Sequence, residues 1–353
     1  GDIVPCHFIP SGLTFYRRRL LEAMFSRYPR PFEWGVDLAP VPAEGGQVPP
    51  FCVLPGQSIF GSSPVDEVKV GEGIFNQHGE LSSVNNIFTK KYEGSVVDIV
   101  PGSLRVPLSV TPDHQFLIKL SRCSTPVWVR ANDIAKGMFL SFPQLSQSNV
   151  SEVDISRYIP NCQFDIDGNI HENFARRENH IPKLITLSDI FMELCGWFIA
   201  EGSTSGDKRD GSQKDIRFSL GPHEDERAQW ILNSVRSIFH VSDGNIVKGD
   251  HSTVIYFRSG ALNQIFRTMF GSGAHNKKMP KWMMMASNSL LICLLRGLWK
   301  GDGHITYSGI PRRLMAGYRT SSRELATGVC AILIKLGIRP TLRRYKQPST
   351  SFG

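Results

Sequence analysis

A pattern of small and acidic residues occurs twice in this chain, and it limits the possible folds more than any other feature. In both copies a glycine is followed five residues later by an acid and then by a second glycine. The first copy, residues 194–202, reads LCGWFIAEG, and the second, residues 295–303, reads LRGLWKGDG. Small residues four positions apart share one face of a helix, where they let two backbones approach closely. The sequence therefore predicts two helices that pack against each other through these faces.

The acids that end the two copies are Glu201 and Asp302, and each precedes a glycine, Gly202 or Gly303. We expect each glycine to cap its helix in the left-handed backbone conformation, so that each acid lies in the last helical turn. Packing of the two helices would bring both carboxylates to the same end, where the helix dipoles are already negative. Like charges in that position repel each other unless a divalent cation lies between them. The pair predicts a metal site, whereas a single copy would fit an ordinary helix that ends in a solvated acid.

Helix, strand and helix recur in the same order around each copy of the pattern. The first series is expected at residues 189–201, 216–220 and 224–240, and the second at residues 290–302, 314–318 and 323–336. An internal repeat of this kind predicts a pseudo-twofold α/β domain with one site at its axis.

The two copies resemble the paired LAGLIDADG motifs of the dodecapeptide homing endonucleases, with Glu201 in place of the more usual Asp. Residues 277–282, KKMPKW, resemble the basic-x-Pro element of that family, so the family's active-site lysine maps onto Lys278. The resemblance covers residues 184–344. It implies a monomer that cuts a long asymmetric site in double-stranded DNA. It also implies that Glu201 and Asp302 hold Mg²⁺ and that Lys278 lies near the scissile phosphate.

The segment upstream of the repeat has a different texture. Between residues 52 and 143, short runs of Val, Ile, Phe and Tyr are separated by Gly, Pro, Asn and Ser, which is typical of an all-β module. Its strands are expected at residues 65–70, 93–100, 109–120 and 127–129. Before the module we expect a helix at residues 13–25 and a Pro/Gly-rich linker at residues 40–50. After it, residues 144–185 are predicted to form a polar, irregular connector.

Cys52 opens this module, and a thiol in that position can attack the carbonyl of Phe51 and convert the peptide bond into a thioester. The shift needs a group that protonates the leaving amide, and the segment TPDH at residues 111–114 supplies two candidates. His114 can donate a proton near neutral pH, and Thr111 offers a hydroxyl to hold the amide or the histidine. Without this context, a lone cysteine is more often a buried apolar residue and a TPDH segment an exposed turn.

These segments resemble parts of inteins and of Hedgehog-type autoprocessing domains. Residues 52–55 resemble the N-terminal splice block, residues 110–117 the TxxH block, and residues 128–138 the strand-helix-strand element. The resemblance implies a Hint-type all-β splicing domain that is incomplete, because no His-Asn followed by Cys, Ser or Thr, the ending of such a domain, occurs in the sequence. Residues 1–51 would be an upstream host segment, an extein joined in cis, and residues 186–353 the embedded endonuclease.

The net charge of +8, from 40 Lys and Arg against 32 Asp and Glu, fits a polyanionic partner such as DNA. Four arginines on expected strands or strand edges are candidates for phosphate or base contacts: Arg217, Arg258, Arg319 and Arg343. The seven cysteines form no CxxC pair, and no apolar run approaches the roughly 20 residues of a membrane span. We therefore expect a soluble, cytoplasmic protein.

Three other classes of protein share part of these features. A DNA-binding regulator on a LAGLIDADG scaffold is expected to lose the paired acids and to lack Cys52 and His114. A Hedgehog-like domain that only cleaves itself would lack the endonuclease repeat. An inactive intein remnant would keep the whole pattern, and the sequence leaves that alternative open. The sequence predicts an intein with two activities, protein splicing and site-specific DNA cleavage.

Overall fold

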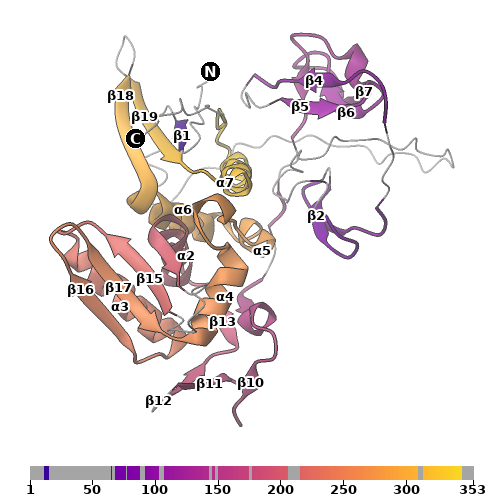
Figure 1. Ribbon diagram of the computed structural model, residues 1–353. Helices are drawn as coiled ribbons and strands as arrows, with labels where there is room; N and C mark the ends of the chain where they lie inside the picture. The colour runs from indigo at the N-terminus through magenta and orange to yellow at the C-terminus, as the bar shows by residue number, and fades with distance from the viewer. Residues whose placement is uncertain are drawn as a thin grey trace.

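The computed structural model describes residues 12–15, 65, 68–76, 78–87, 92–102, 107–142, 145–147, 150–174, 177–205, 215–308 and 313–343. Over these ranges the chain is a mixed α/β protein, with its largest body after residue 150 and small β-sheets before it (Figure 1). Cys52 and the linker predicted at residues 40–50 lie outside the described residues. Among the helices of the described ranges, none is long and apolar enough to cross a membrane.

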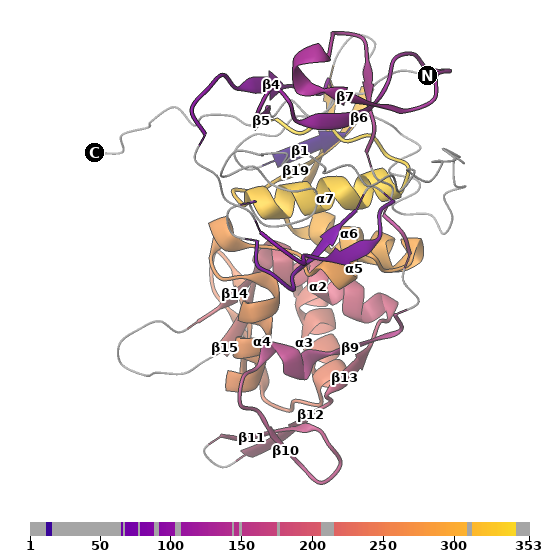
Figure 2. The same cartoon turned by 90° about the vertical axis from the view of Figure 1, so that its right-hand side faces the viewer.

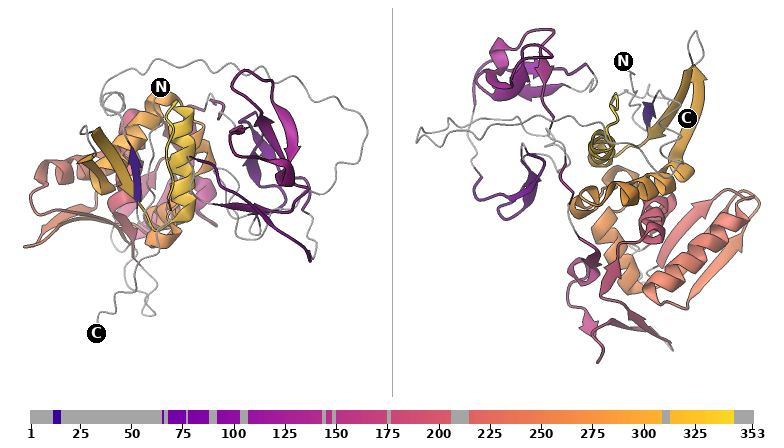
Figure 3. Two further views of the ribbon diagram at one scale, coloured as in Figure 1. Left: turned by 90° about the horizontal axis from the view of Figure 1, so that it is seen from above. Right: turned by 180° about the vertical axis from the view of Figure 1, so that it is seen from behind.

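The first repeat forms a sheet that carries helices on one face. Its elements are α2 (Asp189–Glu201), β14 (Gly202–Thr204), β15 (Asp215–Leu220), α3 (Asp225–Phe239), β16 (Gly244–Lys248), β17 (Thr253–Arg258) and α4 (Gly260–Phe270). The strands are antiparallel in the order β14–β15–β17–β16. Alternate side chains of β15 and β17, such as Phe218 and Phe257, are apolar and fully buried. Helix α3 lies along this apolar face (Figure 3).

The second repeat has the same order of elements. It consists of α6 (Asn288–Asp302), β18 (Gly303–Ser308), β19 (Arg313–Arg319) and α7 (Arg323–Lys335), which confirms the predicted order of helix, strand and helix. Strand β1 (Gly12–Phe15) pairs antiparallel with β19 on the edge that β18 leaves open (Figure 1). The helix predicted at residues 13–25 is therefore wrong at its start, because an open strand edge can recruit a segment with little regard for its local helix propensity. Residues 16–25 lie outside the described residues.

Helices α2 and α6 lie side by side in the middle of the body (Figure 2). Residues 191–199 of α2 are all buried, and α6 buries residues 291–295 and 297–299. A helix that is buried around most of its circumference belongs in a protein core rather than at its surface. A serine begins each helix, since Ser188 Oγ accepts a hydrogen bond from the Phe191 amide at 3.2 Å and Ser287 Oγ does the same for Leu290 at 3.4 Å.

The upstream module consists of small antiparallel sheets. Strand β2 (Gly73–Phe75) pairs with β3 (Leu81–Ser83), β4 (Val97–Ile99) pairs with β5 (Leu108–Val110), and β6 (Gln115–Lys119) lies between β7 (Val127–Arg130) and β8 (Phe139–Leu140). Val110, Phe116, Ile118 and Ala131 form a small core of their own. The strand predicted at residues 65–70 is wrong, because residues 68–70 lead into a turn before β2. The run at residues 109–120 is two strands, separated by the turn at residues 111–114.

The segment predicted as an irregular connector, residues 144–185, contains regular structure. Its elements are β9 (Glu152–Asp154), a 3-10 helix (Ile155–Tyr158), β10 (Gln163–Phe164), β11 (Ile170–Phe174), β12 (Arg177–Ile181) and β13 (Leu184–Thr186). Ile155, Ile170 and Ile181 are at most 1% exposed and belong to the main core. The prediction of irregular structure was wrong because these strands are two to five residues long. Runs so short show little periodicity in the sequence.

Candidate functional site

The two motif helices touch through their backbones. A Cβ atom added to Gly196 would lie 2.2 Å from Leu294 O and 2.7 Å from Leu298 N. A Cβ added to Gly297 would lie 2.1 Å from Glu193 O. Only glycine fits at these two positions, which confirms the close approach that the small residues predicted.

Glu201 and Asp302 end these neighbouring helices, and the structure brings them together. A Cβ added to Gly301, the residue before Asp302, would lie 3.1 Å from Glu201 Cγ and 3.4 Å from Glu201 Oε1. Each acid is the last residue of its helix, so the negative end of each helix dipole points at the pair.

The glycines after the acids do not adopt the left-handed conformation that the sequence predicted. Gly202 has φ −82° and ψ 147°, and Gly303 has φ −76° and ψ 152°, which is extended backbone. A strand begins at each of them, and an added Cβ would lie 2.2 Å from Phe198 Cδ2 or 2.4 Å from Trp299 Cδ1. These positions need glycine for space rather than for backbone conformation.

The electrostatics of the acid pair fit a site for a cation. Burial and the repulsion of Asp302 raise the pKa of Glu201 to about 7. Burial also raises the pKa of Asp302 to about 6, although this residue keeps an exposed side. Carboxylate oxygens that are crowded together in this way are the ligands that a hard divalent cation prefers. The donor set therefore fits Mg²⁺ or a similar ion.

The lysine beside the pair is Lys277, one residue before the position that the sequence resemblance assigned. Its side chain is 7% exposed, and Nζ donates hydrogen bonds to Phe198 O and Gly202 O, both at 2.7 Å. Burial lowers the pKa of Lys277 to about 7, and the charges of Asp302 and Glu201 act in the opposite direction. The lysine is thus the counter-charge nearest to the site.

A cavity of about 320 Å³ is lined by Asp302 but not by Glu201. Its polar lining is Ser203, Lys277, Asp302, Arg319, Thr320 and Ser321, with Tyr318 beside them. Lys278 is not part of this lining. Tyr318 is 1% exposed, and burial raises its pKa well above the usual range, so it stays a neutral hydroxyl. Arg319, a predicted DNA contact, thus lines the same cavity as Asp302.

Two of the other predicted arginines share the outer face of the first sheet. Arg217 and Arg258 line a shallow hollow together with Asp215, Val247, Val254 and Tyr256. The Asp215 carboxylate accepts hydrogen bonds from Arg217 Nε at 3.0 Å and Nη2 at 2.8 Å, and Arg258 lies over the Tyr256 ring at 5.6 Å. Arg343 follows a short bridge at residues 341–342, away from this hollow.

The residues predicted for splicing are only partly within the described ranges. Thr111 is 2% exposed, and its carbonyl accepts the His114 amide at 3.1 Å, which closes the turn between β5 and β6. The His114 ring packs edge-on against Phe116 at 5.0 Å, and burial lowers its pKa. Both residues lie together in the small β core. Cys52 is outside the described residues, so its position relative to them stays a prediction.

Lys277 and Tyr318 line the site but were not predicted as site residues from the sequence, and the ion pairs of Glu193 between the motif helices were not predicted either. Glu193, from α2, accepts hydrogen bonds from Arg296 at 3.1 Å and Lys300 at 2.7 Å, both from α6. The pair of lysines at 277 and 278 signals a basic position, but only the path of the backbone decides which of the two faces inward. Tyr318 has no sequence signal of its own, because a tyrosine in a strand is ordinary.

Several known proteins are similar to parts of this chain. Residues 290–352 match the family model of the LAGLIDADG-like domain. The ATP-dependent DNA helicase Hel308 of Thermococcus kodakarensis is 23% identical over 332 residues, which cover 84% of this chain and 28% of the helicase. An iron-sulfur cluster assembly SufBD family protein of Mycobacterium tuberculosis is 24% identical over 322 residues, or 82% of this chain and 33% of that protein. The chain thus spans about a third of the length of these relatives.

Among solved structures, the complex of I-DmoI with DNA and Mn is similar with a TM-score of 0.27 and 14% identity. The similarity covers 37% of this chain and 90% of I-DmoI. Of these matches, the family model identifies residues 290–352 as a LAGLIDADG-like domain.

Proposed function

We propose that this chain is a site-specific DNA endonuclease of the LAGLIDADG homing type. The backbone contact of α2 with α6 carries the proposal, because it leaves Glu201 and Asp302 side by side with a lysine and an open cavity. A chain that served only as a scaffold would have no need to keep two carboxylates at raised pKa. Since one chain supplies both acids, we propose that it acts as a monomer.

In this proposal the acids and the lysine have separate tasks. Glu201 and Asp302 would hold Mg²⁺, which supplies Lewis-acid activation of water and of the phosphate when it is bound. Lys277 offsets negative charge that develops on the phosphate. Its two hydrogen bonds to Phe198 O and Gly202 O hold the side chain in the lining of the cavity. Because each acid ends a different helix, each would serve one DNA strand.

The raised carboxyl pKa values predict how metal binding depends on pH. The folded, metal-free protein holds the Glu201 proton up to a pKa of about 7, against 4.5 for an ordinary Glu. Because the folded state binds this proton more tightly than the unfolded state, the proton stabilises the fold fully below pH 4.5. This contribution to the free energy of unfolding is lost as the pH rises through 7. A divalent cation competes with the proton, so its binding should strengthen over the same window. We expect Mg²⁺ to raise the melting temperature more at pH 8 than at pH 5.5.

Thermal unfolding with and without Mg²⁺ at the two pH values measures this effect. The double variant Glu201→Gln, Asp302→Asn, in which neither side chain can ionise, should show no pH-dependent gain in melting temperature from the metal. If Mg²⁺ raised the melting temperature of the parental protein equally at both pH values, the metal would not bind to Glu201 and Asp302.

We propose that the outer face of the first sheet contacts double-stranded DNA. Alternate residues of β15 and β17 leave Arg217, Tyr256 and Arg258 on the face that carries no helix. Arg319 and Arg343 are proposed as further contacts from the second repeat. Arginines on a sheet face of this kind reach phosphates and guanine edges.

Arg217→Gln is expected to weaken duplex binding and to reduce the slope of log affinity against log salt by about 1, since one phosphate contact is lost. Fluorescence anisotropy over a salt series measures both quantities. Lys248→Gln is the matched control, because Lys248, like Arg217, is paired with an acid, but its partner is Asp225 of α3 at 2.8 Å, on the side of the sheet that carries the helix. If the two variants lose the same amount of duplex affinity, the loss is a general effect of charge, and Arg217 does not lie on a DNA-binding face.

We also propose that the chain is part of an intein, with Cys52 as nucleophile and residues 1–51 as the upstream extein. The two relatives support this proposal, because one is named a DNA helicase and the other an iron-sulfur cluster assembly protein. Each matches most of this chain but only a minority of its own length. A segment shared by proteins with such different names is what a mobile insert would produce.

In the full-length protein, Cys52→Ala is expected to abolish cleavage after Phe51, and His114→Ala to slow it by about 10²- to 10⁴-fold, the usual contribution of a general acid. Mass spectrometry of the products with added dithiothreitol measures the release of residues 1–51. Unchanged release from Cys52→Ala would exclude the thioester step. An inactive remnant would release nothing even in the parental form.

A further inference from the structure

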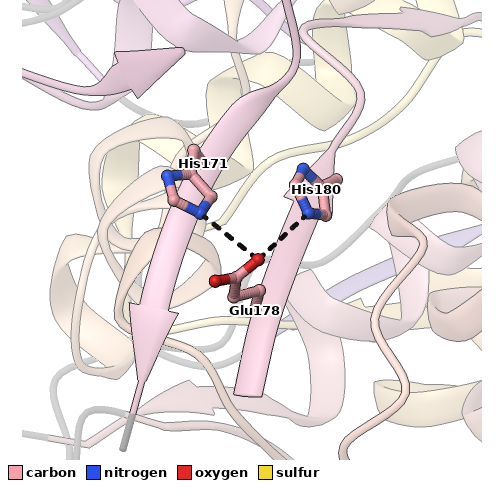
Figure 4. A group of neighbouring side chains, drawn as sticks. All are labelled: His171, Glu178 and His180. Atoms are coloured by element: carbon pink, nitrogen blue, oxygen red, sulfur yellow. Dashed lines mark ion pairs between the residues drawn. The ribbon is translucent and has the colours of Figure 1, made fainter. Parts of the chain in front are cut away.

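The hairpin of β11 and β12 places three metal-ligating side chains on one face. In the antiparallel register His171 lies directly opposite His180, and Glu178 lies two residues before His180 on the same strand. Residues two apart on a strand point to the same side of a sheet, so the three side chains share one face. Figure 4 shows their side chains turned toward one another.

The distances within this cluster are close to those of a metal site. Glu178 Oε2 lies 4.0 Å from His171 Nε2 and 3.8 Å from His180 Nε2. One ligand atom from each of the three residues falls within 4.8 Å of the others. Zinc binds imidazole nitrogen and carboxylate oxygen at about 2.0–2.2 Å, so small rotations of these side chains would close the site. The two rings are stacked with centroids 5.3 Å apart, which leaves both Nε2 atoms on the side of the carboxylate.

A second carboxylate fixes the orientation of His180. Asp165 Oδ2 lies 2.6 Å from His180 Nδ1. Asp165 accepts further hydrogen bonds from the amides of Asp167 at 3.0 Å and Asn169 at 2.8 Å. Because the Asp165 carboxylate can only accept a hydrogen bond, the proton of the neutral His180 ring lies on Nδ1. The lone pair on His180 Nε2 is then available to bind a cation. A carboxylate behind a metal-binding histidine is the usual outer partner of zinc sites.

The opposite face of the hairpin is used for a different purpose. Glu172 accepts hydrogen bonds from Ser259 Oγ at 2.6 Å and the Ala261 amide at 2.8 Å, at the start of α4. Asn179, opposite Glu172, donates to the same carboxylate at 3.1 Å. Ile170 and Ile181 on this face are buried in the core. The inner face thus anchors the hairpin, whereas Glu178 on the outer face is 62% exposed and its carboxylate faces two histidines.

We propose that His171, Glu178 and His180 bind one zinc-class divalent cation, with Asp165 as the positioning residue for His180. Two imidazoles and one carboxylate suit zinc or cobalt better than the hard cation that the paired acids of the motif helices would take. Three protein ligands leave at least one position for water or an exogenous ligand. The bound ion would join the two strands of the hairpin across their outer face.

The test measures binding of ZnCl₂ and CoCl₂ to the whole chain in the Glu201→Gln, Asp302→Asn background, which removes the other proposed metal site. Titration calorimetry with Zn²⁺ should give one site per chain, and Co²⁺ should give the visible absorption bands of a site with nitrogen ligands. His171→Ala, Glu178→Gln and His180→Ala should each abolish both signals. Asp165→Asn should weaken the affinity by about 10- to 100-fold, the usual effect of losing an outer partner.

His251→Ala is the matched control, because it removes another exposed histidine from the loop before β17. It should bind both ions like its parent. Circular dichroism of each variant distinguishes a lost site from a lost fold, and Glu178→Gln keeps the shape of the side chain. No stoichiometric binding by the parent, or equal binding by His180→Ala and His251→Ala, would show that the cluster is only a set of cross-strand ion pairs.

Discussion

Gly297→Ala is expected to destabilise the protein by about 3 kcal/mol or more, at the upper end of the range for overpacked cores. The added Cβ would lie 2.1 Å from Glu193 O and 2.9 Å from Trp197 N, and both of these atoms belong to a helix backbone. A backbone atom cannot rotate away as a side chain can, so α2 and α6 would have to separate. That separation would open the core along both helices and would also part Glu201 from Asp302.

The midpoint of urea unfolding measures this effect. Gly328→Ala is the matched control, because Gly328 also lies in a helix, α7, but its nearest neighbour, Met279 Cε, is 3.7 Å from an added Cβ. That variant should be neutral or gain up to about 1 kcal/mol from the better helix propensity of alanine. Equal stability of the two variants would contradict the backbone contact of the motif helices.

The sequence was sufficient to predict this helix pair and its acids. Gly196 and Gly297 have to be glycine only because another helix backbone lies against them, so their spacing in the sequence predicts that contact. The observed helices begin and end within about two residues of the predicted ones. The same face also brings Gly301 against Ala200, and each acid is the next residue, so the meeting of the acids follows from the same pattern.

Other features could not be predicted because they depend on contacts far apart in the chain. Lys277 rather than Lys278 enters the site, since the path of the chain after α4 decides which of the two adjacent lysines turns inward. Strand β1 forms at residues with a helical pattern, because a strand edge some 300 residues away accepts it. The β11–β12 hairpin was predicted as irregular, although its register creates the cluster of His171, Glu178 and His180.

Glu201→Gln and Asp302→Asn are each expected to reduce DNA cleavage by at least about 10³-fold, the scale on which enzymes lose rate when one electrostatic stabiliser of the transition state is removed. An amide keeps the shape of the acid but cannot supply the charge that holds the cation. Folding should be retained, because the raised pKa values show that the site already tolerates a neutral group. Duplex binding in Ca²⁺ should also be retained.

An endonuclease whose acid variants bind DNA but no longer cut it can be distinguished from a regulator on the same scaffold. A regulator would bind DNA in the parental form without cutting it. An inactive remnant would do neither. Asp133→Asn serves as the control for a change of one negative charge, because Asp133 is exposed in the small β module, outside the acid pair and its cavity.

The most direct test of the paired-acid site is linearisation of a plasmid that carries the host gene without the insert, in the presence of Mg²⁺. The parental chain and Asp133→Asn should convert the plasmid to a single linear product, whereas Glu201→Gln and Asp302→Asn should leave it circular. If both amide variants linearise the plasmid at the parental rate, Glu201 and Asp302 do not form the catalytic metal site.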